Sequence, residues 1–209
     1  MKTTPKSRKG DPPWELAQMY PDQGYWEEED YLDLDTNKLV EFSNGCVEVL
    51  LMPTMFHQVI AGFLYRALFA FVEAHELGKV LSAPMRVRLW PRKFREPDVI
   101  FMLARHSNRM TDRFWKGADL AMEVVSDDPE SRHRDLVKKR REYAKARILE
   151  YWIVDPKQSK ITVLKLQGKK YVVAGEHGPG SMAKSILLKG FEVAVDAALA
   201  GGTANGRKK

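Results

Sequence analysis

The sequence predicts an α/β fold in which helices flank a mixed central sheet, and three observations support this class. Apolar residues between positions 55 and 75 recur at the three- and four-residue spacing of one buried helix face. Residues 120–125 are nearly all apolar, as in a strand buried on both faces. A charge-rich helical segment at 131–146 follows, so one long helix precedes the central strands and another comes after them.

Length and composition predict one packed domain. The chain has 209 residues, of which 44% are hydrophobic and 30% are charged. We expect this domain to comprise residues 14–200, between a disordered tail at 1–13 and a flexible tail at 201–209. The net charge of +6 suits a polyanionic partner, although part of the excess lies in the tails.

Cysteine usage and hydropathy indicate a cytoplasmic protein with no membrane partner. Cys46 is the one cysteine, which excludes an intrachain disulfide and a cysteine metal cluster, and we interpret it as a small buried hydrophobe. The basic start of the chain has no apolar stretch after it, unlike a signal peptide. No apolar run approaches the roughly 18 residues of a membrane span.

The first half of the chain contains predicted helices at 27–34 and 55–75 and predicted strands at 39–42, 46–52, 79–81, 85–90 and 97–103. Asn44 and Gly45 supply a turn between the first two strands, because both residue types tolerate positive φ. Thr54 is the expected N-cap of the long helix. In the second half, strands at 150–155 and 160–166 form a hairpin, and strands at 171–174 and 186–188 extend the sheet.

Two acidic residues interrupt apolar strands. Asp98 opens the strand at 97–103, and Glu123 lies in the middle of 120–125. Burial of an unpaired carboxylate costs several kcal/mol, so such a group is paired, protonated or bound to metal. If the two strands are neighbours, both carboxylates can bind one hard cation, Mg²⁺ or Mn²⁺. A purely structural ion pair of Glu123 with Arg86 or Arg88 is the competing interpretation.

The helix at 131–146 offers a less specific signal. Asp135 and Lys138 are three residues apart and share a face, as in an ordinary surface ion pair. Lys139 and Tyr143 are consistent with a solvated helix face.

Seven short motifs occur in an order that resembles a known family. They are Leu39-Val40-Glu41 up to Gly45, Met52-Pro53 with His57, Arg95-Glu96-Pro97-Asp98-Val99, Glu123-Val124-Val125-Ser126, Asp135-Leu136-Val137-Lys138, Glu142-Tyr143-Ala144 and Glu150-Tyr151-Trp152-Ile153-Val154-Asp155-Pro156. Residues 27–196 thereby resemble the Uma-type "putative restriction endonucleases", a bacterial family of the PD-(D/E)XK nuclease superfamily.

The resemblance implies a restriction-endonuclease-like core, αβββαβ, and metal-dependent cleavage of phosphodiester bonds. Asp98 matches the acid of the PD element, and Glu123 matches the acid of the (D/E)XK element. The lysine of that element is missing, because Val125 stands two residues after Glu123. The resemblance places the basic group on the next helix and assigns it to Lys138.

The resemblance also concerns residues outside this trio. Glu41 matches an earlier acidic position of the family, and His57 recurs near the start of the long helix. For both residues, a metal or substrate role and a structural role stay open. Arg86 and Arg88 could neutralise phosphates that flank the scissile bond, which would make binding sensitive to salt.

These parts predict a Mg-dependent endodeoxyribonuclease whose substrate is nucleic acid, with DNA expected. Mg²⁺ or Mn²⁺ would be held by Asp98 and Glu123, with the backbone carbonyl of Val124 as a third ligand. Lys138 would orient the attacking water or stabilise charge on the phosphoryl oxygens. Cleavage of both strands of a duplex would favour a homodimer.

Two alternatives stay open. A catalytically inactive nucleic-acid-binding module that keeps the fold would explain Val125, and its DNA affinity would survive removal of metal. A protein that binds a partner without touching nucleic acid would fit if Tyr151 and Trp152 formed an exposed interface.

Overall fold

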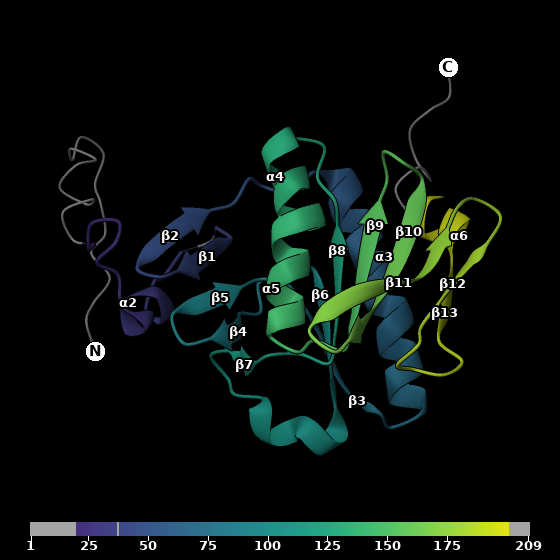
Figure 1. The fold of residues 1–209 in the computed structure, drawn as a ribbon, viewed down its shortest axis with the longest axis horizontal. Helices are drawn as coiled ribbons and strands as arrows, with labels where there is room; N and C mark the ends of the chain where they lie inside the picture. The colour runs from purple at the N-terminus through teal and green to yellow at the C-terminus, as the bar shows by residue number, and fades with distance from the viewer. Residues whose placement is uncertain (1–19, 37, 201–209) are drawn as a thin grey trace.

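The computed structural model describes residues 20–36 and 38–200, and a six-stranded sheet forms its centre (Figure 1). The strand order is β11-β10-β9-β8-β6-β3. β8 (Leu120–Val124) and β9 (Glu150–Asp155) run parallel, whereas the other neighbours are antiparallel. The predicted mixed sheet and the central place of β8 are therefore confirmed. The tails expected at 1–13 and 201–209 lie outside the described residues.

The remaining strands complete this sheet and form two smaller ones. The six-stranded sheet also contains β3 (Gly78–Ser82), β6 (Val99–Leu103), β10 (Lys160–Gln167) and β11 (Lys170–His177). A five-stranded sheet has the order β2 (Cys46–Val49), β1 (Val40–Ser43), β5 (Lys93–Arg95), β4 (Val87–Trp90) and β7 (Trp115–Lys116). A two-stranded sheet pairs β12 (Met182–Lys184) with β13 (Glu192–Ala194).

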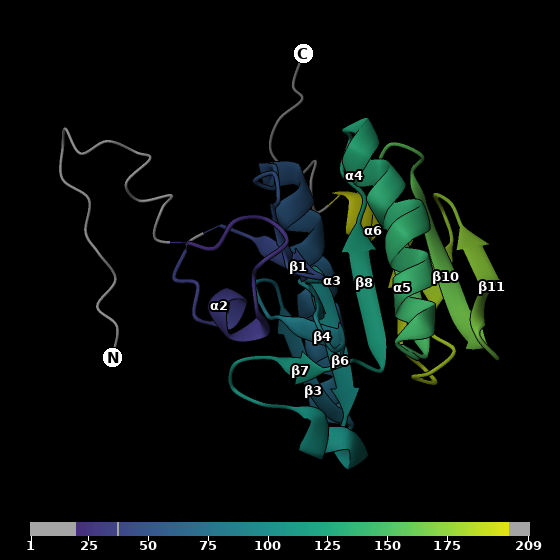
Figure 2. The same cartoon turned by 60° about the vertical axis from the view of Figure 1, so that its left-hand side comes forward.

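Helices cover both faces of the six-stranded sheet, and Figure 2 shows α3 and α5 on opposite sides of β8. α3 (Met55–Ala74) begins at Thr54, whose hydroxyl accepts a hydrogen bond from the His57 amide at 3.2 Å, as predicted for an N-cap. The other face is covered by α4 (Pro129–His133), a π-helical turn (Arg134–Lys138) and α5 (Lys139–Lys145). Short helices α2 (Glu28–Leu32), η1 (Ala104–Arg109) and α6 (Val195–Ala200) lie at the periphery.

By length and hydropathy, α3 would suffice to cross a bilayer, and it is the one such helix among residues 20–36 and 38–200. Its side chains at the predicted spacing are buried against the six-stranded sheet: Ile60, Leu64, Leu68 and Val72. This is the arrangement of a core helix in a folded domain.

The five-stranded sheet and α2 share a separate aromatic core. Tyr31 of α2 packs against Phe42 of β1 and Phe94 of β5, with ring centroids 5.4 and 5.2 Å from the tyrosine ring. The segment Glu96-Pro97-Asp98 leads from β5 in this sheet to β6 in the six-stranded sheet. The junction between the two sheets therefore lies where the sequence motifs gather.

Two predictions about local structure are wrong. Cys46 is exposed because β2 forms an edge of the five-stranded sheet. Residues 186–188 form bends rather than a strand. The backbone amides of Ile186 and Leu187 each donate to the Glu150 carboxylate at 2.7 Å, so they are not available to a sheet partner.

Candidate active site

Asp98 and Glu123 lie next to each other on adjacent strands. Val99 of β6 pairs with Met122 of β8, which places Asp98 beside Glu123. The Val124 amide donates to Asp98 Oδ2 at 2.8 Å and thereby fixes the carboxylate. The neighbourhood of the two strands, on which the sequence interpretation depended, is confirmed.

Glu123 is buried among other acids. Burial raises the pKa of its carboxyl above the usual range, and the charges of Asp98 and Asp135 act in the same direction. Lys139 opposes this shift, with its Nζ 2.8 Å from Glu123 Oε2. Glu123 pairs with neither Arg86 nor Arg88, so the structural ion pair considered from the sequence is replaced by one with Lys139.

Lys139 is the cation at the centre of the site. Its Nζ lies 3.2 Å from Asp135 Oδ1 and 3.9 Å from Glu41 Oε1, in addition to the contact with Glu123. Burial alone would lower the pKa of this ammonium group, but the surrounding carboxylates raise it well above the usual lysine value. Lys139 is therefore charged at neutral pH although it is buried.

Lys138, assigned to the site from the sequence, is exposed at the start of α5. The wide turn before it explains the difference. The Lys139 amide donates to the Arg134 carbonyl five residues earlier, which is the hydrogen bond of a π-helix. Asp135 and Lys139 thus meet at an i,i+4 spacing on the buried face, whereas Lys138 is exposed.

Tyr143 also contacts Glu123. Its hydroxyl donates to Glu123 Oε1 at 2.6 Å, so each oxygen of that carboxylate has a partner. Tyr143 and Lys139 are both buried, so the expectation of a solvated helix face is wrong for these two residues. Tyr151 and Trp152 are buried as well, which removes the exposed aromatic interface considered from the sequence.

Glu41 connects the site to the five-stranded sheet. Its carboxylate forms a hydrogen-bonded ion pair with Arg95, which also donates to Glu142 on α5 at 2.7 and 3.0 Å. Burial acts to raise the pKa of the Glu41 carboxyl, but Lys139 and Arg95 outweigh it, so the pKa is lowered. Glu41 is therefore an ionised member of the same network, behind Lys139.

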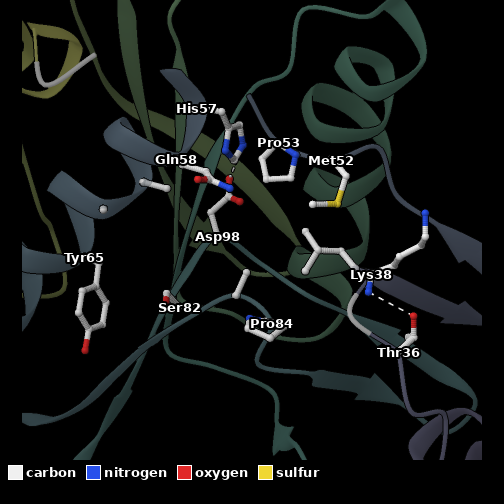
Figure 3. Close-up of a pocket in the computed structure, with 14 residues that line it drawn as sticks. Thr36, Lys38, Met52, Pro53, His57, Gln58, Tyr65, Ser82, Pro84 and Asp98 are labelled. Atoms are coloured by element: carbon white, nitrogen blue, oxygen red, sulfur yellow. Dashed lines mark hydrogen bonds and ion pairs between the residues drawn. The ribbon is translucent and has the colours of Figure 1, made fainter. Parts of the chain in front are cut away.

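His57 contacts the other side of Asp98. Its Nε2 lies 3.2 Å from Asp98 Oδ2 (Figure 3). Burial tends to lower the pKa of the imidazole, but the hydrogen bond and the charge of Asp98 outweigh burial and raise it. His57 also stands where three adjoining cavities of about 430, 40 and 230 Å³ meet.

The smallest of these cavities contains the acidic site. It has a volume of about 40 Å³ and is lined by Asp98, Glu123, Val124, Asp135 and Lys139, among others. That volume holds a few water molecules. The sequence-predicted residues Asp98, Glu123, Val124 and His57 all line it, and Glu41 contacts it through Lys139.

Arg86 and Arg88 are engaged elsewhere. Arg86 donates to the Leu32 carbonyl at 2.9 Å and lies 3.7 Å from Glu96, whereas Arg88 pairs with Glu28 of α2 at 2.8 Å. Both guanidinium groups therefore hold α2 against the five-stranded sheet. Their predicted phosphate contacts would require these ion pairs to open.

Glu96, two residues before Asp98, should make stability depend on pH. Burial raises the pKa of its carboxyl from 4.5 to about 7. The folded state therefore holds the proton more tightly than the unfolded state, and stability falls as pH rises from about 4.5 to about 7. Between about pH 5 and pH 8 we expect Glu96→Gln to gain up to about 3 kcal/mol over wild type, at about 1.4 kcal/mol per pKa unit.

Urea unfolding of the wild type and of Glu96→Gln at both pH values, with EDTA present, measures this difference. A glutamine fits the site, because its amide can donate to the Tyr31 hydroxyl while its oxygen accepts from the Val40 amide, as Glu96 Oε2 does at 3.2 Å. An equal pH dependence of the two proteins would contradict the prediction.

The fold and the site together define a class, a nuclease-like α/β protein. The crystal structure of a "putative nuclease belonging to DUF820" from Anabaena variabilis superposes with a TM-score of 0.68 at 15% identity, covering 83% of this chain and 97% of that chain. This likeness shows the fold and confirms the restriction-endonuclease-like class expected from the sequence. No curated protein matches the chain.

The family follows from the sequence itself. The model of the Uma2 family, described as "Putative restriction endonuclease", matches residues 28–196. The chain belongs to this family, which confirms the resemblance carried by the ordered motifs.

Proposed function

We propose that this protein is a cytoplasmic, metal-dependent endonuclease that hydrolyses phosphodiester bonds, with DNA as its substrate. The observation that carries the proposal is the juxtaposition of Asp98 and Glu123 on adjacent strands, with the ammonium group of Lys139 2.8 Å from Glu123. Membership of a family described as restriction endonucleases supports a nucleic-acid substrate. Cleavage of both strands of a duplex would favour two such sites, and the proposal for a duplex substrate therefore includes a homodimer.

The residues of the site fit a divalent cation. Mg²⁺ is commonly bound through one or two carboxylates while it keeps several waters, and the cavity offers two carboxylates and room for water. Among the described residues, no group of three or more His, Cys, Asp or Glu side chains is arranged to hold a metal. Asp98, Glu123 and the Val124 carbonyl would hold the cation as a sparse set of protein ligands, with water and substrate oxygens as its remaining ligands.

A bound cation would supply an acidified water for attack on phosphorus. The side chains around it have separate tasks. Lys139 keeps its proton, so it would stabilise negative charge on the phosphoryl group rather than accept a proton. Tyr143 orients the Glu123 carboxylate, and the Val124 amide together with His57 orients Asp98.

Cleavage assays test the proposal. We expect full-length protein with millimolar Mg²⁺ or Mn²⁺ to cut supercoiled plasmid or single-stranded DNA, and we expect EDTA to abolish cleavage. Asp98→Asn serves as the reference, because asparagine keeps the acceptor for the Val124 amide but loses the charge. Equal products from wild type and Asp98→Asn on every substrate would refute the proposal.

Binding measurements separate the nuclease from an inactive binding module. DNA affinity that survives EDTA and Glu123→Gln, without cleavage in either metal, would establish the module instead. The main argument for that alternative is the valine at position 125, where the superfamily has a lysine. Lys139 places a cation beside Glu123 from the helix, which weakens this argument.

A further inference from the structure

A large cavity opens directly beside Asp98. It has a volume of about 430 Å³, in the range of pockets that enclose small organic ligands. Asp98 and His57 close one end, and Tyr65 of α3 lies at the other (Figure 3). The cavity therefore adjoins the acidic site, with which it shares His57 and Asp98, but it is about ten times as large, and the tasks assigned above leave it unused.

The walls of this cavity are mostly apolar. Ala61 and Gly62 form part of the α3 side, and their small size leaves the space open. Met52, Pro53 and Pro84 contribute from the opposite loops. A charged phosphate or a hydrated ion would gain little from such walls, whereas a flat apolar ring would be desolvated by them.

Polar groups are placed at the margins. Gln58 lies in the first turn of α3 and Tyr65 lies about two turns further along, and both line the cavity. Neither side chain has a hydrogen-bond partner among residues 20–36 and 38–200. A carboxamide donates and accepts hydrogen bonds at once, as the edge of a nucleobase requires. The ring of Tyr65 offers a face for stacking, and it already stacks on Phe69 at a centroid distance of 5.7 Å.

Two cations lie at the rim. Lys38 lines the cavity across from Gln58 and Tyr65 (Figure 3). Arg66 extends over Gly62, where an added Cβ would lie 3.3 Å from its guanidinium. Within the described part of the chain, neither Lys38 nor Arg66 forms an ion pair. Both charges are thus available to phosphates on either side of an inserted group.

We propose that this cavity binds one unpaired nucleobase of the nucleic-acid substrate, and this inference rests on the proposed function. The base would enter between Gln58 and Tyr65, and its own phosphate would then lie at the Asp98 end. A regular duplex cannot offer such a base without unpairing it, which costs a few kcal/mol. Single-stranded, bulged or frayed nucleic acid is accordingly the preferred substrate class.

Equilibrium binding in EDTA tests the inference independently of cleavage. Three fluorescent DNA duplexes of one sequence are compared: fully paired, with one bulged thymidine, and with one bulged abasic residue. We expect the full-length protein to bind the duplex with the bulged thymidine about tenfold more tightly than the paired and abasic duplexes. This difference corresponds to the binding free energy that one stacked base contributes. Equal affinity for the thymidine and abasic bulges would overturn the inference.

Two variants localise the effect to the cavity. Ala61→Leu should narrow it where the base would lie and Tyr65→Ala should remove its aromatic wall, and each should erase the preference for the bulged base while affinity for the paired duplex persists. Ala70→Leu makes the same change at an exposed position of α3 outside the cavity and should leave the preference intact. A preference that survives both cavity variants would overturn the assignment.

Failure of this inference is distinguishable from failure of the nuclease proposal. Metal-dependent cleavage without a base preference would leave the nuclease and remove the cavity's assigned ligand. A base preference in EDTA without cleavage in Mg²⁺ or Mn²⁺ would leave the cavity site and remove the nuclease.

Discussion

Lys139→Met is expected to lower the cleavage rate about a thousandfold, the upper end of the range for loss of one preorganised electrostatic contact. Lys139 supplies the charge 2.8 Å from Glu123, whereas Arg134, the other cation lining the acidic site, contacts Asp135 at 3.6 Å. Lys138→Met is the matched control, because it makes the same change at the adjacent, exposed position. Cleavage by Lys138→Met should equal that of wild type.

The same variant should also lose stability. Removal of Lys139 leaves Glu41, Glu123 and Asp135 as buried acids with one cation fewer, and breaking a buried ion pair in this way costs about 3–5 kcal/mol. Urea unfolding measures the loss. Adding Glu123→Gln to Lys139→Met should restore part of the lost unfolding free energy. A double-mutant cycle detects this recovery even if Lys139→Met alone is partly unfolded.

The reverse result would favour the residue assigned from the sequence. If Lys138→Met abolished cleavage while Lys139→Met cut at the wild-type rate, Lys138 would be the functional lysine. The π-helical turn would then have to rearrange when substrate binds.

Glu123→Gln is expected to lower metal-dependent cleavage, again about a thousandfold, without loss of stability. Burial and the charges of Asp98 and Asp135 make ionisation of this carboxyl costly and raise its pKa. Glutamine removes that cost, and it can still accept from Lys139 and donate to the Tyr143 hydroxyl. The substitution should therefore lower cleavage activity while the free energy of unfolding stays at or above that of the wild type.

Thermal or urea unfolding at about pH 8 checks the stability of Glu123→Gln, and plasmid nicking checks its activity. Val124 provides a nearby control: Val124→Ile keeps the backbone carbonyl and should retain cleavage. A loss of more than about 2 kcal/mol in Glu123→Gln would show that the acid stabilises the fold, as a structural residue does.

The acidic pair was predictable from the sequence for a physical reason. Carboxylates inside apolar strands are costly, so Asp98 and Glu123 stand out without knowledge of the fold. Their adjacency depended on the pairing of β6 with β8, which the ordered motifs implied and the structure confirms. The main strands and both long helices followed from periodicity in the same way.

The lysine was not predictable by counting residues. An i,i+4 pair of Asp135 and Lys139 is visible in the sequence, but the same spacing occurs on many solvated helices. The π-helical turn decides which lysine faces the acids, and no residue type in Arg134–Lys138 signals such a turn. The ion-pair partners of Arg86 and Arg88 were not predictable for a related reason, since Glu96 and Glu28 lie on other segments of the chain.

The junction between the two sheets has a consequence for folding cooperativity. Glu41 and Arg95 come from the five-stranded sheet, whereas Asp98 and Glu123 stand at or in the six-stranded sheet, and Lys139 bridges both groups from the helix. The contacts of Lys139 with Glu41 and of Arg95 with Glu142 cross between the two groups, so they exist only while the smaller sheet is docked. Local opening of the smaller sheet would therefore leave several buried charges without their partners at once. This cost couples the two sheets into one cooperative unit.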